Sequence, residues 1–210
     1  MTVKPPAPHL AGPAAAIDEA LSSRAEATRQ RVLDAALEVF CEQTYGGARI
    51  EHIAERAGVA MGTIYKYFTG KQALVNEVFR YWKEQTRDYA YPHRAGMSAR
   101  ERYHAWFEQV CRFATEHPLA YEFLVTHHHA PYLDAESLAV GDPMDRLSIR
   151  NIADGQAEGT VRDGDPALLS AMLVGILIGL TREARTRGVA LDAEARALAE
   201  ACGWDMLRAH

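Results

Sequence analysis

The chain has 210 residues, of which 48% are hydrophobic, and its formal net charge is −5 at pH 7. This length fits one large domain or two small ones, and the hydrophobic share is ample for a buried core, so a chain without a core is excluded. The charge is uneven, because residues 24–71 hold seven Lys or Arg against six Asp or Glu, while residues 72–210 hold fifteen against twenty. The near-neutral charge of residues 24–71, ahead of an acidic remainder, is a weak indication that an anionic partner binds this N-terminal part.

Three cysteines, Cys41, Cys111 and Cys202, are widely spaced, and each lies in an apolar helical context. We interpret these thiols as reduced and buried, which suits a cytoplasmic protein. The N-terminus has no basic stretch ahead of an apolar core, so no signal peptide is predicted. The longest apolar run, at 167–180, spans about 14 residues, fewer than the roughly 20 that cross a bilayer. These features predict a soluble cytoplasmic protein without a membrane partner.

Nearly every segment after the N-terminus has apolar residues at helical spacing, and no long run has the period of a strand, so we predict an all-α fold. Residues 1–23, with prolines among alanines, are predicted to form a mobile tail. A first helix is expected at about 27–43. Its apolar face consists of Val32, Leu33, Ala36, Val39 and Phe40.

Two short helices are predicted next, at 50–57 and 61–68. A fourth helix begins after Thr69, which together with Gln72 has the spacing of a capping box, and it extends to about residue 89. Further helices are expected in the rest of the chain, where capping residues, prolines and glycines mark their ends. The predicted caps are a capping box of Ser98 with Glu101 and the N-cap residues Asp142, Asp165 and Asp192. Their ranges are 99–116, 119–128, 143–158, 166–187 and 193–208.

Residues 50–67 have the pattern of two helices that cross at a steep angle. Gly58 lies where a tight turn needs a left-handed backbone, which costs glycine little. Ala54 is small enough to allow the crossing, and Val59 and Ile64 are placed to pack across the first helix. Two short helices joined by such a turn form a helix-turn-helix, whose second helix enters the major groove of DNA.

The second helix of this unit has a polar aromatic outward face. Ile64 and Phe68, four residues apart, are predicted to face inward. The outward side chains are then Thr63, Tyr65, Lys66 and Tyr67. Hydroxyl groups bind phosphates or bases, and an ammonium neutralises a phosphate or reaches a guanine edge. Lys71, at the start of the next helix, adds a second ammonium beside free backbone amides. The alternative is an ordinary helical hairpin with surface tyrosines.

The stretches VLDAALEVF and IEHIAERAGVAMGTIYKYFTGKQALVNEVF resemble the N-terminal domain of the TetR family of bacterial transcriptional regulators, over residues 29–79. The resemblance implies a three-helix DNA-binding head, a connecting helix, an all-α ligand-binding body and a homodimer. Members of this family usually repress transcription until a small molecule enters the body and shifts the heads. By position, the matching DNA contacts are Thr63, Tyr65, Lys66, Tyr67 and Lys71.

The chain departs from the family pattern beside both short helices. Ala48 and Arg49 stand where a serine or threonine usually caps the second helix, which forfeits a cap of roughly 1 kcal/mol. We expect Arg49 to contact a phosphate instead. Met61 follows Ala60 in place of a more polar pair, so its contact with DNA should be apolar, for example with a thymine methyl.

Another departure is Thr44, which stands where the family often has a helix-ending glycine, and we expect Gly46 and Gly47 to supply the turn. These departures affect the expected operator sequence and not the DNA-binding role. Together with the resemblance, the helix pattern divides the chain into a tail at 1–23, a helix-turn-helix head at 24–70 and a ligand-binding and dimerisation domain at 71–210, in which helix 71–89 is the connection.

Aromatic and aliphatic residues of the body are candidates for a ligand cavity, because such sites are apolar with a few polar anchors. For any one of these residues, ordinary core packing is the simpler interpretation. The candidates are Trp106, Phe107, Val110, Phe113, Tyr121, Phe123, Leu124, His128 and Met144.

His127, His128 and His129 form a run that raises the question of a metal site. Consecutive side chains on a helix point about 100° apart, so three in a row cannot converge on one ion. His104 and Glu108, four residues apart, have suitable geometry, but such pairs are common by chance. We predict no metal and no cofactor. One of the three histidines is expected to point inward, as a ligand anchor or a core group.

The predicted helix at 166–187 is apolar all round and contains Gly175 and Gly179. Each interior glycine costs up to about 1 kcal/mol relative to alanine, and this cost makes sense if another backbone comes close. We hypothesise that this helix and the last one form half of a four-helix dimer interface. Burial within the monomer is the alternative. The interface candidates are Met172, Gly175, Ile176, Gly179, Leu198 and Cys202.

The leading hypothesis is a dimeric, ligand-responsive transcriptional repressor that a small-molecule effector releases from a palindromic operator in double-stranded DNA. The alternatives are an activator, or a regulator of the same fold that needs no ligand. A helical enzyme or a carrier of lipophilic ligands is a remote alternative, because no Ser/His/Asp set, phosphate loop or metal cluster supports it. We therefore predict that the protein is not an enzyme.

Overall fold

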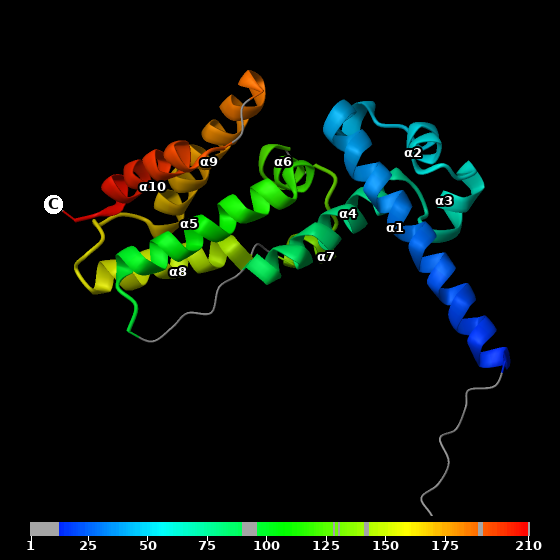
Figure 1. Cartoon of the computed structure of the whole chain (residues 1–210), viewed down its shortest axis with the longest axis horizontal. Helices are drawn as coiled ribbons and strands as arrows, with labels where there is room; N and C mark the ends of the chain where they lie inside the picture. Colours follow the sequence, from blue (N-terminus) through cyan, green and yellow to red (C-terminus); the bar gives the residue numbers. More distant parts are fainter. Residues whose placement is uncertain are drawn as a thin grey trace, which may run out of the picture.

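The computed structural model describes residues 13–89, 96–127, 129, 131–140, 143–188 and 191–209, with the backbone alone at 13–21 and 143–144. Within these ranges the chain forms helices joined by turns, apart from a β-bridge between Val161 and Arg208. The predicted all-α fold is confirmed. Figure 1 shows the N-terminal helices at one end of the molecule and the C-terminal helices toward the other.

The N-terminal head consists of α1 (Pro13–Gly47), α2 (Ile50–Ala57) and α3 (Met61–Tyr67). Both short helices pack against α1. The fully buried side chains between them include Phe40, Ile53 and Ile64. At the turn from α2 to α3, Gly58 has φ 64° and ψ 38°, the left-handed conformation that the sequence predicts there. The helix-turn-helix is therefore built as expected.

The first helix begins earlier than the sequence analysis places it. α1 starts at Pro13, so residues 13–23 are helical where a mobile tail was expected. Proline suits the first position of a helix, because the N–H that it lacks would have no helical partner. Ala14, Ala15 and Ala16 then supply the residue type with the highest helix propensity. Residues 1–12 lie outside the described ranges.

The end of α1 holds a strained residue. Thr44 has φ 56° and ψ 172°, and among the described residues it is the one non-glycine with a positive φ. Neither Gly46 nor Gly47 has a positive φ, so the turn expected at these glycines is made at Thr44 instead. A β-branched side chain is disfavoured in this conformation, which is normally left to glycine.

We predict that Thr44→Gly stabilises the protein by about 1 kcal/mol. Glycine relieves a backbone strain of roughly 1–3 kcal/mol, but part of this gain is offset because glycine gives the unfolded chain more conformational entropy. The free energy of unfolding from urea titration tests this. As a control, Thr28→Gly at a regular position of α1 should destabilise by about 0.5 kcal/mol. A destabilised Thr44→Gly would show that the threonine conformation is not strained.

The body follows without a break from the head. Its described helices are α4 (Lys71–Gln85), the 3-10 turn η1 (Thr86–Tyr89), α5 (Ala99–Glu116), α6 (Pro118–Thr126), α7 (Ala135–Val140), α8 (Pro143–Ala157), α9 (Pro166–Arg187) and α10 (Ala193–Leu207). The sequence analysis misses α7, because six residues are too few to show a helical period.

Most of the predicted caps are present. Ser98 and Glu101 form a capping box at the start of α5, and Asp165 and Asp192 accept backbone N–H groups at the starts of α9 and α10. The capping box predicted for α4 is wrong, because its N-cap residue is Gly70 and no side chain caps it. Gln72 points elsewhere, and its amide donates to the Tyr132 carbonyl at 3.2 Å. The N-cap predicted at position 142 lies outside the described residues.

Helix α4 leads from the head into the body, and it contacts α1 as well as α6 and α7. In the body, α5 packs against α8 and α10, and α8 also packs against α9. Figure 1 shows α9 and α10 side by side in the half of the molecule away from α3.

The three cysteines are free thiols, as predicted, but they are not all buried. Cys111 is buried and Cys41 is half-buried, and burial raises the pKa of both thiols to about 12, so they remain protonated. Cys202 is exposed. The expectation of burial fails for Cys202 because none of the described residues covers the face of α10 on which it lies.

Candidate nucleic-acid interface and ligand cavity

Helix α3 turns a polar aromatic face to solvent and is held from behind by buried side chains. Ile64 is fully buried, and Phe68, just after the helix, is 6% exposed. On the other side Tyr65 is 52% exposed, Met61 is 44% exposed and Lys66 is also exposed. The structure thus offers a phenol, a thioether and an ammonium on the outward side of α3.

Tyr67 does not share this outward orientation. It is half-buried, its hydroxyl donates to the Ala25 carbonyl at 3.2 Å, and its ring centroid lies 6.3 Å from that of Phe68. Thr63 is half-buried as well. Tyr67 therefore fastens α3 to the N-terminal half of α1, a contact that the sequence analysis misses because it starts the first helix at about residue 27.

Lys71 has partners inside the head. Its ammonium donates to the carbonyls of Tyr45 at 2.7 Å and Ala48 at 2.9 Å, and it lies 4.5 Å from the centroid of the Tyr45 ring. These contacts close the turn between α1 and α2 and attach the start of α4 to it. The ammonium predicted to bind a phosphate is therefore first a structural group, with one N–H donor left for other partners.

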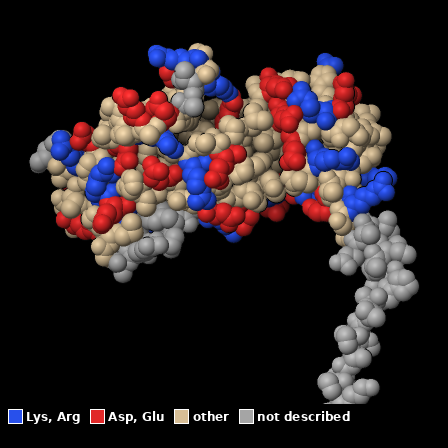
Figure 2. All heavy atoms as spheres, in the orientation of Figure 1, with Lys and Arg blue, Asp and Glu red and all other residues tan. Residues whose placement is uncertain are grey.

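The cations of the head differ in how they are compensated. Arg56 is paired with Glu38 at 2.8 Å and with Glu42 at 2.9 Å, and Figure 2 shows acidic and basic side chains interspersed over the head. Other head cations are exposed and form no ion pair within the described ranges. They are Arg24, Arg31, Arg49 and Lys66.

Two of these free cations lie beside the short helices. Arg49 is the N-cap residue of α2 and makes no side-chain capping bond, so its guanidinium is available to an anion. Arg24 precedes Ala25, whose carbonyl binds Tyr67 of α3. Arg24 is therefore a further candidate for a phosphate contact, which the sequence analysis misses because it places residue 24 ahead of the first helix.

A buried amide joins the connecting helix to the loop between α6 and α7. Asn76, which is 1% exposed, donates to the Tyr132 carbonyl at 2.9 Å and accepts from the Asp134 N–H at 2.8 Å. Tyr132 also stacks on Tyr45 of the head, with ring centroids 4.2 Å apart. Local sequence gives no sign of this link, because the partners of Asn76 lie more than fifty residues further along the chain.

Between α5, α6, α8 and α9 the body has a cavity of about 450 Å³ that is partly open to solvent. Trp106, Val110, Phe113, Tyr121 and Leu124 line it, as the sequence analysis expects. The further lining residues are Thr86, Val125, Asp145, Val174 and Leu177, which come from several helices and share no sequence motif.

Two of the remaining candidates have described side chains that do not line this cavity. Phe107 and Phe123 are almost completely buried and belong to the core. The side chains of His128 and Met144 lie outside the described residues. Phe107 is absent from the lining because it is the residue after Trp106, and adjacent positions on a helix point about 100° apart.

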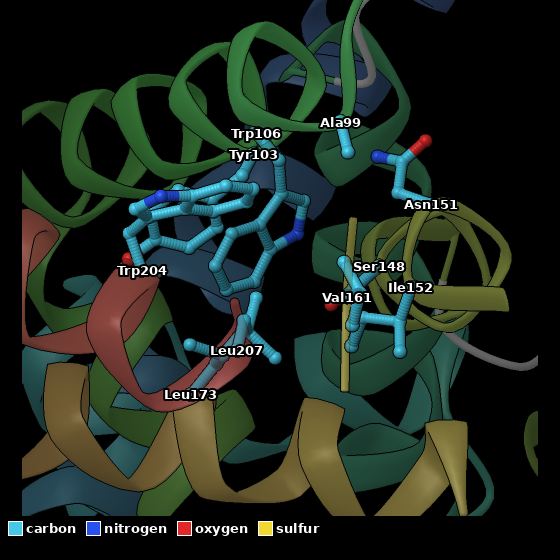
Figure 3. A pocket seen from close by; sticks show the side chains of 10 residues that line it. All are labelled: Ala99, Tyr103, Trp106, Ser148, Asn151, Ile152, Val161, Leu173, Trp204 and Leu207. Carbon is cyan, nitrogen blue, oxygen red and sulfur yellow. The ribbon is translucent and has the colours of Figure 1, made fainter. Parts of the chain in front are cut away.

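A second cavity of about 290 Å³ lies next to the first, and Trp106 lines both. Figure 3 shows Trp106 and Tyr103 of α5 facing Trp204 and Leu207 of α10 on one side and Ser148, Asn151 and Ile152 of α8 on the other. The ring centroids of Tyr103 and Trp204 are 5.8 Å apart. Trp106 therefore borders both cavities.

Two buried donor groups in the walls of these cavities form no hydrogen bond of normal geometry among the described residues. They are the indole N–H of Trp106, whose residue is 3% exposed, and the hydroxyl of Tyr121. The nearby Thr181 hydroxyl donates to the Leu177 carbonyl at 2.9 Å. Burial raises the pKa of Tyr121 above its usual value, so its hydroxyl keeps the proton. A ligand with acceptor oxygens would satisfy these buried donors.

The inward histidine of the 127–129 run is His129. Its ring bonds the Phe123 carbonyl at 2.7 Å and the Tyr132 hydroxyl at 2.8 Å, so it is a satisfied core group. His127 is half-buried, and this burial lowers its pKa. The expectation that one of the three points inward is confirmed for His129.

Folding brings Glu200 of α10 next to His104 and Glu108, so that ligand atoms of all three lie within 4.8 Å of one another. The Glu200 carboxylate already accepts from His104 at 3.0 Å and pairs with Arg100 at 2.5 Å. Although burial acts in the opposite direction, these partners lower the pKa of Glu200. We interpret the cluster as an ion-pair network that joins α5 to α10, and the absence of a metal stays a prediction.

The outer face of α9 and α10 is apolar and uncovered. Leu168, Met172 and Leu198 are 56%, 46% and 66% exposed. By length and composition α9 would suffice to cross a membrane, yet only 22% of its most apolar window is buried in the protomer. A Cβ added at Gly175 or Gly179 would meet no atom of the described residues within 4 Å. Contacts within the protomer therefore give no reason for these two glycines.

Two family models match the chain. The model for bacterial regulatory proteins of the tetR family matches residues 32–78, and that for the tetracyclin repressor-like C-terminal domain matches residues 76–209. The first match covers the helix-turn-helix and about half of α4, and the second covers nearly all of the body.

Relatives and solved structures agree with these matches. The transcriptional repressor KstR of Rhodococcus jostii is 31% identical over 142 residues, 65% of each chain, and the regulator SrpR of Pseudomonas putida is 46% identical over 57 residues, 27% of each chain. The chain thus spans less than two thirds of the length of these relatives. The fold is shared with a TetR family transcription regulator from Marinobacter aquaeolei VT8, at a TM-score of 0.74 and 19% identity over 90% of this chain and 100% of that one. The chain therefore belongs to the TetR family of bacterial transcription regulators, which act by binding DNA and are not enzymes.

Proposed function

We propose that this protein is a dimeric repressor that leaves a palindromic operator when a small molecule enters its body. The observation that carries the proposal is the outward face of α3, where Tyr65 and Lys66 are exposed while Ile64 behind them is fully buried. A helix held in this way can enter the major groove, with its hydroxyl and ammonium at base edges or phosphates. Met61 at the start of α3 suits a thymine methyl.

The exposed apolar face of α9 and α10 supports a homodimer. Its interface would include Met172, Gly175, Ile176, Gly179, Leu198 and Cys202. An apolar face of this kind marks an interaction site, and a second copy that packs against it would explain why two interior glycines are kept on α9. A two-fold axis through this four-helix contact would present two heads to the two half-sites of a palindrome. A DNA-binding protein of this kind works in the cytoplasm.

The connecting helix supports a response to ligand. Asn76 and Tyr132 join α4 to the α6–α7 loop, and the 450 Å³ cavity is lined in part by α6. A ligand that favours one arrangement of α6 would therefore favour one spacing of the heads. A coupling of 1–3 kcal/mol would weaken operator binding by about 5- to 150-fold. The relative KstR is named a repressor, which supports repression by this protein as well. Activation is the alternative, and a reporter assay in cells would distinguish the two.

We predict that Lys66→Ala lowers affinity for all DNA sequences and reduces the slope of log affinity against log salt by about one unit per protomer, because one phosphate contact is lost. Tyr65→Phe should lower operator affinity roughly tenfold, since each protomer loses one hydrogen bond of about 0.5–1.5 kcal/mol. Gel-shift titrations at several salt concentrations measure both.

Arg87→Gln is the control for these variants, because this arginine is exposed in the body and pairs only locally with Glu84 at 2.9 Å. It should bind operator DNA like the unaltered protein. If Lys66→Ala and Tyr65→Phe also bind unchanged while thermal melting shows them folded, α3 is not the recognition helix.

A further inference from the structure

A surface groove of about 1240 Å³ lies outside the 450 Å³ cavity, between the end of α5, α6 and the C-terminal half of α9. Its lining is mixed, with threonine hydroxyls and charged groups among aliphatic side chains. The lining includes Thr115, Leu119, Glu122, Ile178, Arg182 and Arg185. The groove is on a different side of α9 from Met172 and Gly179, so a second copy on that face would leave it open.

The groove and the two cavities form a series with shared walls. Tyr121 lines both the groove and the 450 Å³ cavity, and Trp106 lines both that cavity and the 290 Å³ cavity. Tyr121 is 5% exposed and Trp106 is 3% exposed. Each pair of neighbouring spaces is thus bordered by one shared, buried aromatic side chain, and a side chain can rotate to connect neighbouring spaces.

Charge differs along this series. At the groove, Arg185 is paired with Glu122, whereas Arg182 is exposed and forms no ion pair within the described ranges. Figure 2 shows basic side chains at the protruding C-terminal end of α9. Further in, the walls are mostly aliphatic and aromatic, and the Trp106 N–H is an unpartnered donor. The entrance therefore carries one uncompensated positive charge, whereas the inner walls are mostly apolar, with Thr86 and Asp145 among the lining residues.

We propose that this series is a binding channel for a chain-like amphiphile with an anionic head group. The head group would lie in the groove on Arg182, and the hydrocarbon chain would pass Tyr121 into the cavity bounded by Trp106. This inference rests on the proposed function, because it names the chemical class of the effector. A compact aromatic ligand would need only the 450 Å³ cavity, and it would leave the shared walls and the basic entrance without a role.

The test compares three probes with the same twelve-carbon chain, dodecanoate, dodecanol and dodecyltrimethylammonium, each below its micellar concentration. Binding is measured as displacement of the neutral fluorophore N-phenyl-1-naphthylamine from the full-length protein. Dodecanoate should bind most tightly. From hexanoate to dodecanoate, affinity should rise by about fourfold per methylene, because each buried methylene contributes about 0.8 kcal/mol to the binding free energy.

Two variants locate the head group and the chain. Arg182→Gln should lower the affinity for dodecanoate by roughly tenfold, which corresponds to the loss of one charge-assisted hydrogen bond. The affinity for dodecanol should be unchanged. Arg187→Gln is the matched control on the same helix, since this arginine pairs with Glu183 at 2.7 Å and does not line the groove. Val174→Phe narrows the cavity behind Tyr121, so the affinity should stop rising at a shorter ligand chain length than it does in the unaltered protein.

Equal affinity for the three head groups, or an unchanged dodecanoate affinity in Arg182→Gln, would overturn the proposal. So would a lack of chain-length dependence. These outcomes are separate from a failure of the repressor proposal, because displacement is measured without DNA. If the protein does not bind operator DNA while dodecanoate binds as expected, the binding channel is supported and the proposed regulation of transcription is wrong.

Discussion

A Gly179→Arg variant is expected to sediment as a folded monomer and to lose operator affinity by roughly 10²- to 10⁴-fold, the gain that linking two binding modules provides. The protomer itself should tolerate the change. A Cβ at Gly179 meets nothing within 4 Å, and arginine is a better helix former than glycine. At the proposed interface, however, the guanidinium would be buried without a partner, which is strongly unfavourable.

Leu138→Arg is the control for this variant, because Leu138 is 58% exposed on α7, away from the face of α9 and α10. It adds the same charge at an exposed helical position, so it should sediment as a dimer and bind operator DNA normally. Sedimentation velocity over a range of concentrations separates the two species. A dimeric Gly179→Arg would assign the interface to another surface.

The local features of this fold could be predicted because they depend on neighbours in sequence. Apolar spacing gave the range of α2, and the Gly58 turn and the Ser98 capping box each need only residues a few positions apart. The inward side of α3 follows in the same way, since Ile64 and Phe68 are separated by one helical turn. For these elements, local propensity and tertiary packing favour the same conformation.

The features that were missed depend on partners far away in sequence. Tyr67 is drawn inward by Ala25, forty-two positions earlier, and Lys71 is held by the carbonyls of Tyr45 and Ala48. Propensity describes Tyr67 and Lys71 as surface residues, and only the position of α1 shows otherwise. The cavity combines both kinds of information, because α5 and α6 could be identified from sequence, whereas Val174 and Asp145 join the lining only after folding.

The other large effect is expected for Asn76→Ala, which should lower the free energy of unfolding by about 2–4 kcal/mol. The amide of Asn76 spans α4 and the α6–α7 loop, donating to Tyr132 and accepting from Asp134. Alanine would leave the Asp134 N–H without this partner in a buried setting, and each such loss costs about 1–3 kcal/mol. The small side chain would also leave a void where the amide was.

Gln72→Ala provides a matched control, because Gln72 donates to the same Tyr132 carbonyl at 3.2 Å but is itself exposed. The carbonyl would keep its bond from Asn76, so the loss should stay within about 0.5 kcal/mol. Urea titrations of both variants give the comparison. Asn76→Ala should also bind operator DNA with a weaker response to ligand, because α4 would no longer follow the α6–α7 loop. A variant that keeps both its stability and its full ligand response would show that head and body communicate by a route other than Asn76.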